Sequence, residues 1–360
     1  MKDTIKVAII GCGGIANGKH MPSLKRLPDV EMVAFCDLIE ERAVKAKEEF
    51  GTADARVYID YKALLASEPE VDAVHVCTPN RSHSFITIDS LEAGKHVMCE
   101  KPMAKTSAEA KAMCEAAKRT GKKLTIGYQN RFRKEVQQLH TLCENGALGD
   151  IYFAKAHAVR RAVPNWGVFL NEEEQGGGPL IDIGTHALDM TLWLMNNYKP
   201  LYVVGNAYHK LAETENAANA FGPWDPKEFT VEDSAFGFVT MENGATIVLE
   251  SSWALNILDV GEAKTTLCGT KGGADLRDGL RINGEENGTL YEKKIEVTMS
   301  GVAFYDSTES NLDNDREAAY WIHCLKTDSE LVVKPEQALV VTQILEAIYE
   351  SSKTRKPVYF

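Results

Sequence analysis

The sequence predicts an α/β protein in which an N-terminal, doubly wound parallel sheet is followed by an α+β domain with an open, mainly antiparallel sheet. In the first part of the chain, short β-rich runs alternate with helical patterns, which is typical of parallel strands joined by helices. Further along, longer runs with partial period-2 alternation are joined by short turns, which favours antiparallel pairing. The length of 360 residues exceeds what one hydrophobic core usually organises. We therefore expect two domains, 1–127 and 128–360, with the C-terminal helix packing back on the first.

The N-terminal domain is expected to consist of short buried strands separated by helices. The run Val71–Cys77 is apolar throughout except for His75, as expected of a strand covered on both faces. One helix opens on the capping box Thr106-x-x-Glu109. The expected strands are Ile5–Ile10, Glu31–Cys36, Val71–Cys77, His96–Cys99 and Leu124–Gly127, and the expected helices run from a glycine-rich turn to about Arg26, over Glu40–Phe50, over Ser82–Ala93 and from the capping box to Arg119.

The second domain is expected to pair its longer strands as hairpins and to carry helices on one face of the sheet. The tight-turn sequence Glu242-Asn243-Gly244 between two strand patterns predicts one such hairpin. The expected strands are Ile151–Val159, Leu201–Tyr208, Val231–Met241 and Ala245–Trp253, and the expected helices are the apolar segment Pro179–Met195 and the C-terminal segments Asp315–Leu325 and Pro335–Ser352.

Composition limits the environment and the partners of the chain. The apolar share of 44% and the charged share of 26% are those of an ordinary globular protein. A formal charge of -12 argues against a nucleic-acid or anionic-membrane partner, because both need a basic surface. The N-terminus has no signal-peptide pattern, and no apolar run reaches membrane-spanning length. The eight cysteines include no C-x-x-C pair. We expect a reduced, soluble, cytoplasmic protein.

A glycine-rich turn between the first strand and the first helix predicts a dinucleotide site of the Rossmann type. The run Gly11-Cys12-Gly13-Gly14-Ile15-Ala16 fits the G-x-G-x-x-G/A pattern, in which the glycines allow a tight turn and close approach of a pyrophosphate to a helix N-terminus. Asp37 ends the second strand, where a carboxylate accepts the ribose hydroxyls and repels a 2′-phosphate. NAD is therefore expected over NADP, although Arg42 leaves NADP open. The alternative is an ordinary βα turn with a helix-capping Asp37.

Two further strand ends carry residues that fit the same edge of the sheet. Cys77-Thr78-Pro79-Asn80 follows a buried strand, where ligands of open α/β sheets bind, although Thr78-Pro79 also suits a simple strand terminator. The charged pair of Glu100-Lys101-Pro102 follows the next strand, and Pro102 stops that strand from running on. Taken alone, Glu100-Lys101-Pro102 is better explained by a surface turn.

The apolar helix after Gly176–Gly178 carries an unusual polar stripe. Asp182, His186 and Asp189 stand at i, i+4 and i+7 and share one helix face. Burying this stripe without partners costs several kcal/mol (~2–7 per group), so it is expected to face a cavity or a network. A satisfied pair inside the core is the alternative. A metal site is not expected, since no His/Cys cluster lies nearby.

Taken together, these motifs resemble the glucose–fructose oxidoreductase / inositol dehydrogenase / rhizopine catabolism family over nearly the whole chain. The combination of Glu100-Lys101-Pro102 with Asp182-x-x-x-His186 is more specific than any single motif. The resemblance also rests on Gly11–Ala16, on Cys77–Asn80 with His83, on Gly127-Tyr128-Gln129-Asn130-Arg131-Phe132 and on Glu232-Asp233. It implies a Rossmann domain followed by an open sheet that mediates homodimers or homotetramers.

The resemblance implies a role for each motif residue. His186 is expected to take the hydroxyl proton as hydride leaves, Lys101 to donate a hydrogen bond to the developing alkoxide, and Asp182 to orient the substrate or the imidazole. Arg131, Arg160 and Trp166 are expected in the substrate pocket by position, with packing or surface roles as alternatives. The expected cofactor-binding residues are Gly11, Cys12, Gly13, Gly14, Ile15, Asp37, Cys77, Thr78, Pro79, Asn80, His83, Glu100, Lys101 and Gln129.

The function implied is hydride transfer between NAD and a secondary alcohol or ketone of a sugar, inositol or related polyol. Two alternatives share parts of this pattern. One is a non-catalytic regulator that binds a dinucleotide, as the yeast galactose regulator does, but such a binder has no need of Lys101 and His186. The other is an NAD-dependent glycosidase that oxidises its substrate transiently. The sequence leaves open which sugar, which carbon and which direction.

Overall fold

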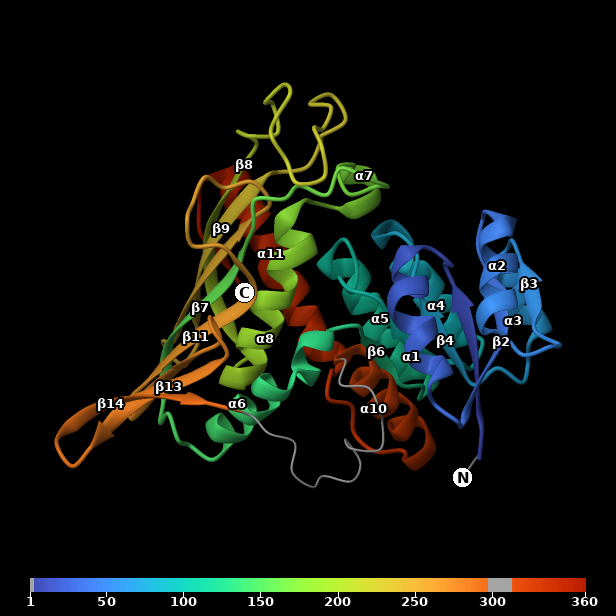
Figure 1. The fold of residues 1–360 in the computed structure, drawn as a ribbon, viewed down its shortest axis with the longest axis horizontal. Helices are drawn as coiled ribbons and strands as arrows, with labels where there is room; N and C mark the ends of the chain where they lie inside the picture. The colour runs from blue at the N-terminus through green and yellow to red at the C-terminus, as the bar shows by residue number, and fades with distance from the viewer. Residues whose placement is uncertain (1–2, 297–312) are drawn as a thin grey trace. The chain divides into compact units, whose positions relative to one another are not determined.

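The computed structural model describes residues 3–296 and 313–360. Within them the chain forms two compact units, each built around one β-sheet (Figure 1). The chain passes from the first unit to the second at Phe132/Arg133, beyond the 127/128 boundary expected from the sequence. Unit 1 comprises Met1–Ala104, Ala108–Phe132 and Met299–Leu339, and unit 2 comprises Lys105–Ser107, Arg133–Thr298 and Val340–Phe360.

Unit 1 has a six-stranded parallel sheet in the order β3-β2-β1-β4-β5-β6. The strands are β1 (Ile5–Ile10), β2 (Val30–Cys36), β3 (Arg56–Tyr58), β4 (Ala73–Val76), β5 (His96–Cys99) and β6 (Leu124–Ile126). The helices are η1 (Ala16–His20), α1 (Met21–Lys25), α2 (Glu40–Phe50), α3 (Tyr61–Ser67), η2 (Asn80–Ser82), α4 (His83–Glu92), α5 (Ser107–Thr120), η3 (Gln129–Phe132) and α10 (Asp313–Thr327). The expected parallel sheet is confirmed. Strand β3 and helix α3 were not predicted from the sequence, because their three and seven residues are too short to show a clear period.

The strand order reverses between β1 and β4, and this switch point lies beside the glycine-rich turn. Gly11 follows β1 with a φ of 92°, which only glycine adopts without strain. A Cβ at Gly11 would lie 2.7 Å from the carbonyl carbon of Cys77, which follows β4. The two strand ends therefore approach so closely that a side chain is excluded. In open α/β sheets, ligands bind in the crevice at such a switch point.

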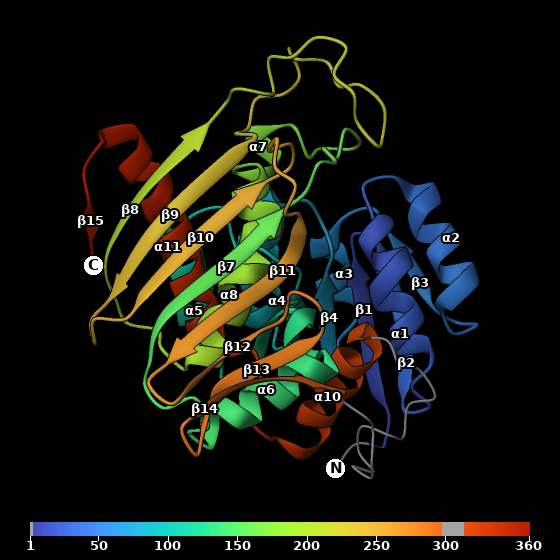
Figure 2. The ribbon, with the colours of Figure 1, turned by 60° about the vertical axis from the view of Figure 1, so that its left-hand side comes forward.

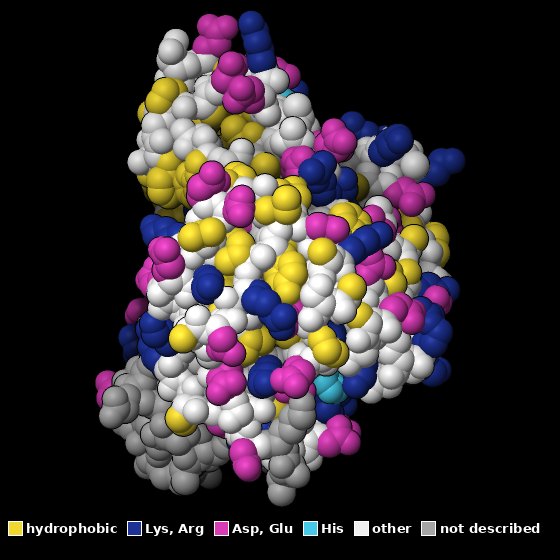
Figure 3. Space-filling model, turned by 90° about the vertical axis from the view of Figure 1, so that its right-hand side faces the viewer, with side chains coloured by type: hydrophobic (Ala, Val, Ile, Leu, Met, Phe, Trp, Pro, Cys, Tyr) yellow, Lys and Arg dark blue, Asp and Glu magenta, His cyan; other side chains and the backbone are white. Residues whose placement is uncertain are grey.

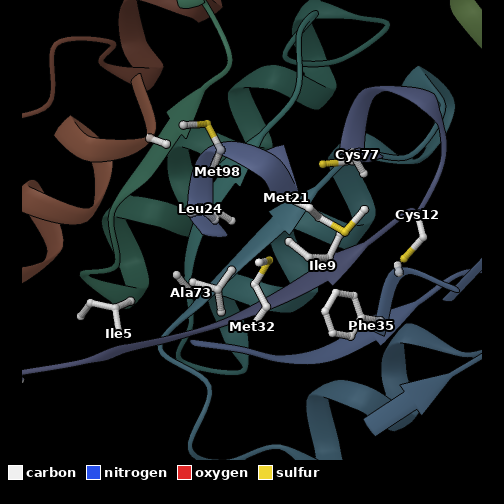
Figure 4. Close-up of a cluster of buried hydrophobic side chains, with 14 of the residues drawn as sticks. Ile5, Ile9, Cys12, Met21, Leu24, Met32, Phe35, Ala73, Cys77 and Met98 are labelled. Atoms are coloured by element: carbon white, nitrogen blue, oxygen red, sulfur yellow. The ribbon is translucent and has the colours of Figure 1, made fainter. Parts of the chain in front are cut away.

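The core of unit 1 lies between the sheet and helices α1 and α10. Met21 and Leu24 of α1 pack with Ile9 of β1 and Phe35 of β2, as Figure 4 shows, and all four are buried. Trp321 of α10 belongs to the same cluster. Burying each of these large side chains stabilises the unit by about 1.5–3 kcal/mol. The core thus fixes the helix that starts at the glycine-rich turn.

Unit 2 has a nine-stranded mixed sheet in the order β14-β13-β12-β11-β7-β10-β9-β8-β15 (Figure 2). Its pairs are antiparallel except β7 with β10, which run parallel. The strands are β7 (Ile151–Val159), β8 (Pro200–Tyr208), β9 (Ser234–Met241), β10 (Thr246–Ser252), β11 (Gly261–Gly269), β12 (Gly272–Asp275), β13 (Leu280–Glu286), β14 (Thr289–Ile295) and β15 (Val358–Tyr359). Strands β11 to β15 were not predicted from the sequence. Strands β13 and β14 are largely exposed, so they lack the alternation that burial imposes.

Helices lie on one face of this sheet. The helices of unit 2 are α6 (Lys134–Glu144), α7 (Glu172–Gln175), η4 (Leu180–Gly184), α8 (Thr185–Met195) and α11 (Pro335–Thr354), the last of which begins in unit 1. Helix α8 packs against β7 and β11. Cβ atoms at the paired Gly205 and Gly237 would lie 2.8 Å and 2.5 Å from Ile348 side-chain atoms, so these glycines let α11 approach the strands closely. Figure 2 shows α8 and α11 behind the strands.

Two local expectations are corrected. The strand expected over Val231–Met241 begins at Ser234, which pairs with Tyr208. The side chains of Glu232 and Asp233, just before it, accept hydrogen bonds from backbone N–H groups of Gly178 and Lys210. The helix expected over Pro179–Met195 contains a π-helical segment, Leu180–Gly184, before α8 begins. The Glu242–Gly244 hairpin is confirmed: β9 and β10 are antiparallel, and Gly244 has a φ of 84°.

Two further findings concern the surface and the helices. On the face shown in Figure 3, acidic and basic side chains are interspersed, with apolar side chains scattered between them. Among the described helices, none is both long and apolar enough to cross a bilayer.

Candidate functional site

The glycine-rich turn forms an open cradle at the start of a helix. Helical residues begin at Gly14 and continue through η1 and α1. A Cβ at Gly13 or at Gly14 would meet nothing within 4 Å, so the space in front of this backbone is open. Ile15 is also exposed. An open helix N-terminus attracts phosphate groups through its N–H groups and dipole. The cradle therefore fits the pyrophosphate of a dinucleotide.

Asp37 lies beside this cradle at the end of β2. Its Oδ2 accepts a 2.8 Å hydrogen bond from the backbone N–H of Cys12, and its Oδ1 accepts one of 2.9 Å from Ile39. The carboxylate thus joins the glycine-rich turn to the start of α2. Cys12 is buried, and burial raises the pKa of its thiol to about 12, so it acts as a packed apolar side chain.

The loop after β4 is held by its own side chains. Ser82 donates a 2.8 Å hydrogen bond to Oγ1 of Thr78. His83 was expected to bind the cofactor, but it is only 1% exposed, and its ring nitrogens lie 2.8 Å from the carbonyl oxygen of Pro102 and 2.9 Å from that of Thr78. His83 thus joins two strand-end loops, and its contact with a cofactor stays a prediction. Thr78, Pro79 and Asn80 lie at the switch point, as expected from their position after β4.

Glu100 and Lys101 follow β5 at the same edge of the sheet. Glu100 is 4% exposed, and its Oε2 accepts a 2.9 Å hydrogen bond from the backbone N–H of Lys101. Its Oε1 lies 2.8 Å from Lys19 Nζ and 2.8 Å from His20 Nε2. Burial alone would raise the pKa of Glu100, but Lys19 and His20 hold it well below its usual range. Glu100 is therefore an internal anion, and its contact with a cofactor stays a prediction. The Lys101–Pro102 peptide bond is cis.

The two residues expected from η3 differ in their surroundings. Gln129 Oε1 lies 3.4 Å from Lys19 Nζ, so Gln129 stands next to the Glu100 cluster. Arg131 is fully buried, and its Nη1 donates to the carbonyl oxygen of Val332 at 2.9 Å and to Oε1 of Gln337 at 2.6 Å. These contacts fit the packing alternative for Arg131, and its contact with a substrate stays a prediction. Its guanidinium ties η3 to the segment around the start of α11.

Asp182 lies half-buried on η4 between two donors. Its Oδ2 accepts hydrogen bonds from Trp253 Nε1 at 3.1 Å and from Arg160 Nη2 at 3.3 Å. Arg160 also donates through Nη1 to Glu262 Oε1 at 2.9 Å. His186 follows at the start of α8 and is half-buried as well. A carboxylate fixed by two donors and an imidazole near it in sequence can orient and deprotonate a hydroxyl group.

Glu232 fixes the start of this helix. Its Oε2 accepts from the N–H of Gly178 at 2.8 Å, and its Oε1 accepts from the N–H of Leu180 at 3.0 Å and from the hydroxyl of Tyr349 at 2.9 Å. Burial raises the pKa of Glu232 to about 7, although these donors oppose the shift. Ser251 Oγ donates to the carbonyl oxygen of Pro179 at 2.7 Å. The segment carrying Asp182 is thus held at its N-terminal end.

Unit 2 also offers a pocket and an exposed aromatic cluster. A pocket of about 410 Å³ is lined by Arg160, Glu262 and the loop residues Ile257, Leu258 and Val260, among others. Trp166 was expected near the substrate; it is 50% exposed and makes edge-to-face contacts with Phe169 and Phe221. An exposed indole of this kind can pack on the apolar face of a sugar ring.

Several residues of the site were missed in the sequence. Lys19 and His20 lie in the first helix, and Trp253 follows β10. His75 was visible as the single polar residue of a buried strand, and its ring Nδ1 lies 3.0 Å from Nδ1 of His20. The contact of Glu317 with Lys19 could not be predicted, because no sequence pattern shows that helix α10 lies against Lys19. Among the described residues no group of three His, Cys, Asp or Glu side chains could hold a metal ion.

Comparisons with known proteins point to one family. Residues 5–128 match the profile of an oxidoreductase family with an NAD-binding Rossmann fold, and residues 136–275 match the GFO/IDH/MocA C-terminal domain. The D-glucoside 3-dehydrogenase of Escherichia coli strain K12 is 38% identical over 97% of this chain and 96% of its own.

Solved structures agree with this match. The structure of aldose-aldose oxidoreductase from Caulobacter crescentus complexed with glycerol has a TM-score of 0.81 at 25% identity, covering 99% of this chain and 100% of its own. Levoglucosan dehydrogenase complexed with NADH and levoglucosan shares the fold with a TM-score of 0.82 at 21% identity, covering 99% of each chain.

Proposed function

The chain belongs to the GFO/IDH/MocA oxidoreductase family, an NAD-binding family, and from this premise we propose that it oxidises the C3 hydroxyl of a D-glucoside. The choice of substrate rests on the D-glucoside 3-dehydrogenase that is 38% identical along almost the entire chain. The product of this reaction is a 3-keto-glucoside. A secondary alcohol flanked by other hydroxyl groups also suits a site rich in hydrogen-bonding side chains.

The observation that carries the proposal is the fixed carboxylate of Asp182. Arg160 and Trp253 both donate to its Oδ2, so its direction is set before a substrate arrives. We assign to Asp182 the task of orienting the sugar and to His186 that of accepting the hydroxyl proton. Lys101 donates a hydrogen bond to the alkoxide, an interaction that strengthens as negative charge develops in the transition state.

NAD⁺, when bound, supplies the hydride acceptor. The residues that would hold it are those of the open cradle and the neighbouring strand ends. Gly13 and Gly14 leave room for a pyrophosphate at the helix N-terminus, and Asp37 would accept the hydroxyls of the ribose. The carboxylate disfavours a 2′-phosphate, which supports NAD over NADP. Thr78 and Gln129 would contact the nicotinamide side.

Assembly and location are part of the proposal. Val204 pairs with Phe238, and Phe238 with Val248, so their side chains share the sheet face opposite the helices. Val204 and Phe238 are exposed apolar residues, and such a face favours a homo-oligomer. Sedimentation of a Phe238→Arg variant tests this, since an unchanged mass would contradict it. All eight cysteines are thiols, which supports a reducing cytoplasm.

The test is a substrate screen on the purified protein. Methyl glucosides, D-glucose and myo-inositol are offered with NAD⁺ or NADP⁺ while absorbance of the reduced nicotinamide is followed. We expect turnover with a glucoside and NAD⁺, and its loss in Lys101→Ala and His186→Ala with NADH binding retained. His209→Ala is the control, because His209 Nε2 lies 2.8 Å from the backbone carbonyl of Phe229, away from Asp182 and His186 in the sequence.

Other outcomes of the screen overturn the proposal in distinct ways. Cleavage of the glycoside without accumulation of NADH would identify an NAD-dependent glycosidase. NADH binding without turnover of any sugar would identify a regulator. Wild-type rates in Lys101→Ala or His186→Ala would remove these two residues from the reaction.

A further inference from the structure

Lys19 is an almost completely buried ammonium group in unit 1. It is 5% exposed, and its Nζ lies 2.8 Å from Glu100 Oε1, 2.9 Å from Glu317 Oε2 and 3.4 Å from Gln129 Oε1. One cation therefore contacts side chains from the end of β5, from α10 and from η3. A buried charge of this kind is retained only where its partners compensate the loss of hydration.

The charges of this cluster are arranged around Lys19. Burial alone would lower the pKa of Lys19, but Glu100 and Glu317 raise it above its usual value, so the ammonium stays charged. Lys19 and His20 keep Glu100 ionised, whereas burial raises the pKa of Glu317. His75, which contacts His20, has its pKa lowered well below the usual value by burial. Glu100 is thus the carboxylate that the cluster keeps ionised, and Lys19 forms an ion pair with it at 2.8 Å.

Two contacts link the Lys19–Glu100 ion pair to Lys101 and Gln129. The second oxygen of Glu100, Oε2, accepts the backbone N–H of Lys101, so the orientation of the carboxylate sets the position of the Lys101 backbone. The contact of Gln129 Oε1 with Lys19 turns the amide nitrogen of Gln129 away from the ammonium. Both Lys101 and Gln129 are residues to which the proposed function gives a part in the reaction.

Gly127 leaves the space that this arrangement needs. A Cβ at this position would lie 3.0 Å from Glu100 Oε1 and 3.3 Å from Lys19 Nζ. These separations are tighter than ordinary van der Waals contact, so alanine would push the ion pair aside. Gly127, the residue after β6, therefore leaves room for the Lys19–Glu100 ion pair, although it makes no bond to either side chain.

We propose that Lys19 is a positioning residue for hydride transfer: through Glu100 it fixes the backbone of Lys101, and directly it fixes the amide of Gln129. This inference rests on the proposed function, which gives Lys101 and Gln129 their roles. Lys19 itself touches neither substrate nor cofactor. Its effect on the rate is geometric, since small displacements of a reacting group cost large factors in rate.

The test replaces Lys19 by methionine, which keeps the length of the side chain and removes the charge. Lys95→Met is the matched control: Lys95 is also buried in unit 1, and its Nζ donates to the carbonyl oxygens of Glu68, Pro69 and Val71 at 2.8–2.9 Å. Both variants lose a buried cation and are expected to melt at lower temperature. Lys19→Met is expected to lose about 10²-fold in kcat, with KM and the Kd of NADH changed by less than about threefold. Lys95→Met is expected to keep its kcat.

A double-mutant cycle separates positioning from general damage. Glu100→Gln removes the negative charge and leaves one acceptor oxygen where Glu100 has two, so it cannot accept from both Lys19 and the Lys101 N–H. It is therefore expected to lower kcat about as much as Lys19→Met. The double variant Lys19→Met/Glu100→Gln is then expected to be no slower than either single variant, because both act through the same connection. Gly127→Ala is expected to lower kcat in the same direction.

Two results would overturn the inference. One is a Lys19→Met variant whose melting temperature falls while its kcat equals that of Lys95→Met. The other is additive losses of kcat in the double variant. Failure of the proposed function is distinguishable from both: in that case Lys101→Ala itself keeps the wild-type rate, or no glucoside is turned over by the unaltered protein.

Discussion

The indole N–H of Trp253 donates a 3.1 Å hydrogen bond to Oδ2 of Asp182, and Trp253 is completely buried. Because the indole is fixed by packing, this contact sets the direction of the carboxylate more firmly than the half-exposed Arg160 does. A buried aromatic residue thus fixes the direction of the carboxylate to which we assign the orientation of the sugar.

Trp253→Phe is expected to lower kcat about tenfold, because a hydrogen bond to a charged group is worth roughly 1.5–3 kcal/mol. Steady-state kinetics with the glucoside measures it. Trp224→Phe is the matched control, since Trp224 donates its indole N–H to the carbonyl oxygen of Ala212 at 2.9 Å and makes no contact with Asp182. Equal rates in the two variants would show that the Trp253 contact has no part in the reaction.

Arg131→Met is expected to lower the melting temperature and to leave the KM for the glucoside unchanged. The reason is that its Nη1 donates to Val332 and Gln337, and removal leaves these half-buried acceptors without this donor. Arg160→Met provides the contrast: it removes a donor to Asp182 and is expected to impair turnover with little change in melting temperature. A large rise in KM for Arg131→Met at an unchanged melting temperature would restore Arg131 to the substrate pocket.

Glu232 is expected to make the stability of unit 2 depend on pH. Its pKa is raised by burial from 4.5 to about 7 in the folded protein, so the folded state favours the protonated form. The resulting stability is fully present below pH 4.5 and is lost as pH rises through about 7. Thermal melts from pH 5 to pH 8 measure it, with Glu232→Gln as the reference that lacks the group. Parallel pH dependences of the two proteins would contradict the shifted pKa.

Asp37→Ser is expected to weaken NADH binding more than NADPH binding, because it removes both the acceptor for the ribose hydroxyls and the charge that repels a 2′-phosphate. Fluorescence titration with each coenzyme gives the ratio. Asp60→Ser is the control: Asp60 accepts from the N–H of Lys62 at 2.9 Å, just as Asp37 accepts from Ile39 at the same distance. If the coenzyme preference stays as it was, Asp37 is a capping residue and no more.

The sequence predicts well those features that a local pattern encodes. The alternation of apolar runs and helices predicted the parallel sheet, and the glycine pattern placed the cradle after β1. The hairpin at Glu242–Gly244 was confirmed because its turn chemistry is local. Strands β13 and β14 were missed because much of their surface is exposed, so no alternation marks them.

Long-range side-chain partners could not be predicted. His83 and Arg131 were assigned to ligands because polar residues near a motif invite that interpretation, yet each binds backbone carbonyl groups. Lys19 and Glu317 are separated by almost the whole chain, and no local pattern joins them. The π-helical segment Leu180–Gly184 was also invisible, because its apolar residues suit an α-helix equally well.

The central claim is that hydride passes from C3 of a glucoside to the nicotinamide. Its most direct test is to incubate the protein with NAD⁺ and methyl β-D-glucoside deuterated at C3, and to examine the reduced nicotinamide by NMR. We predict deuterium at C4 of the nicotinamide, and none when the label is placed at C2 instead. Reduced nicotinamide without label from C3, or no reduced nicotinamide at all, would contradict the account.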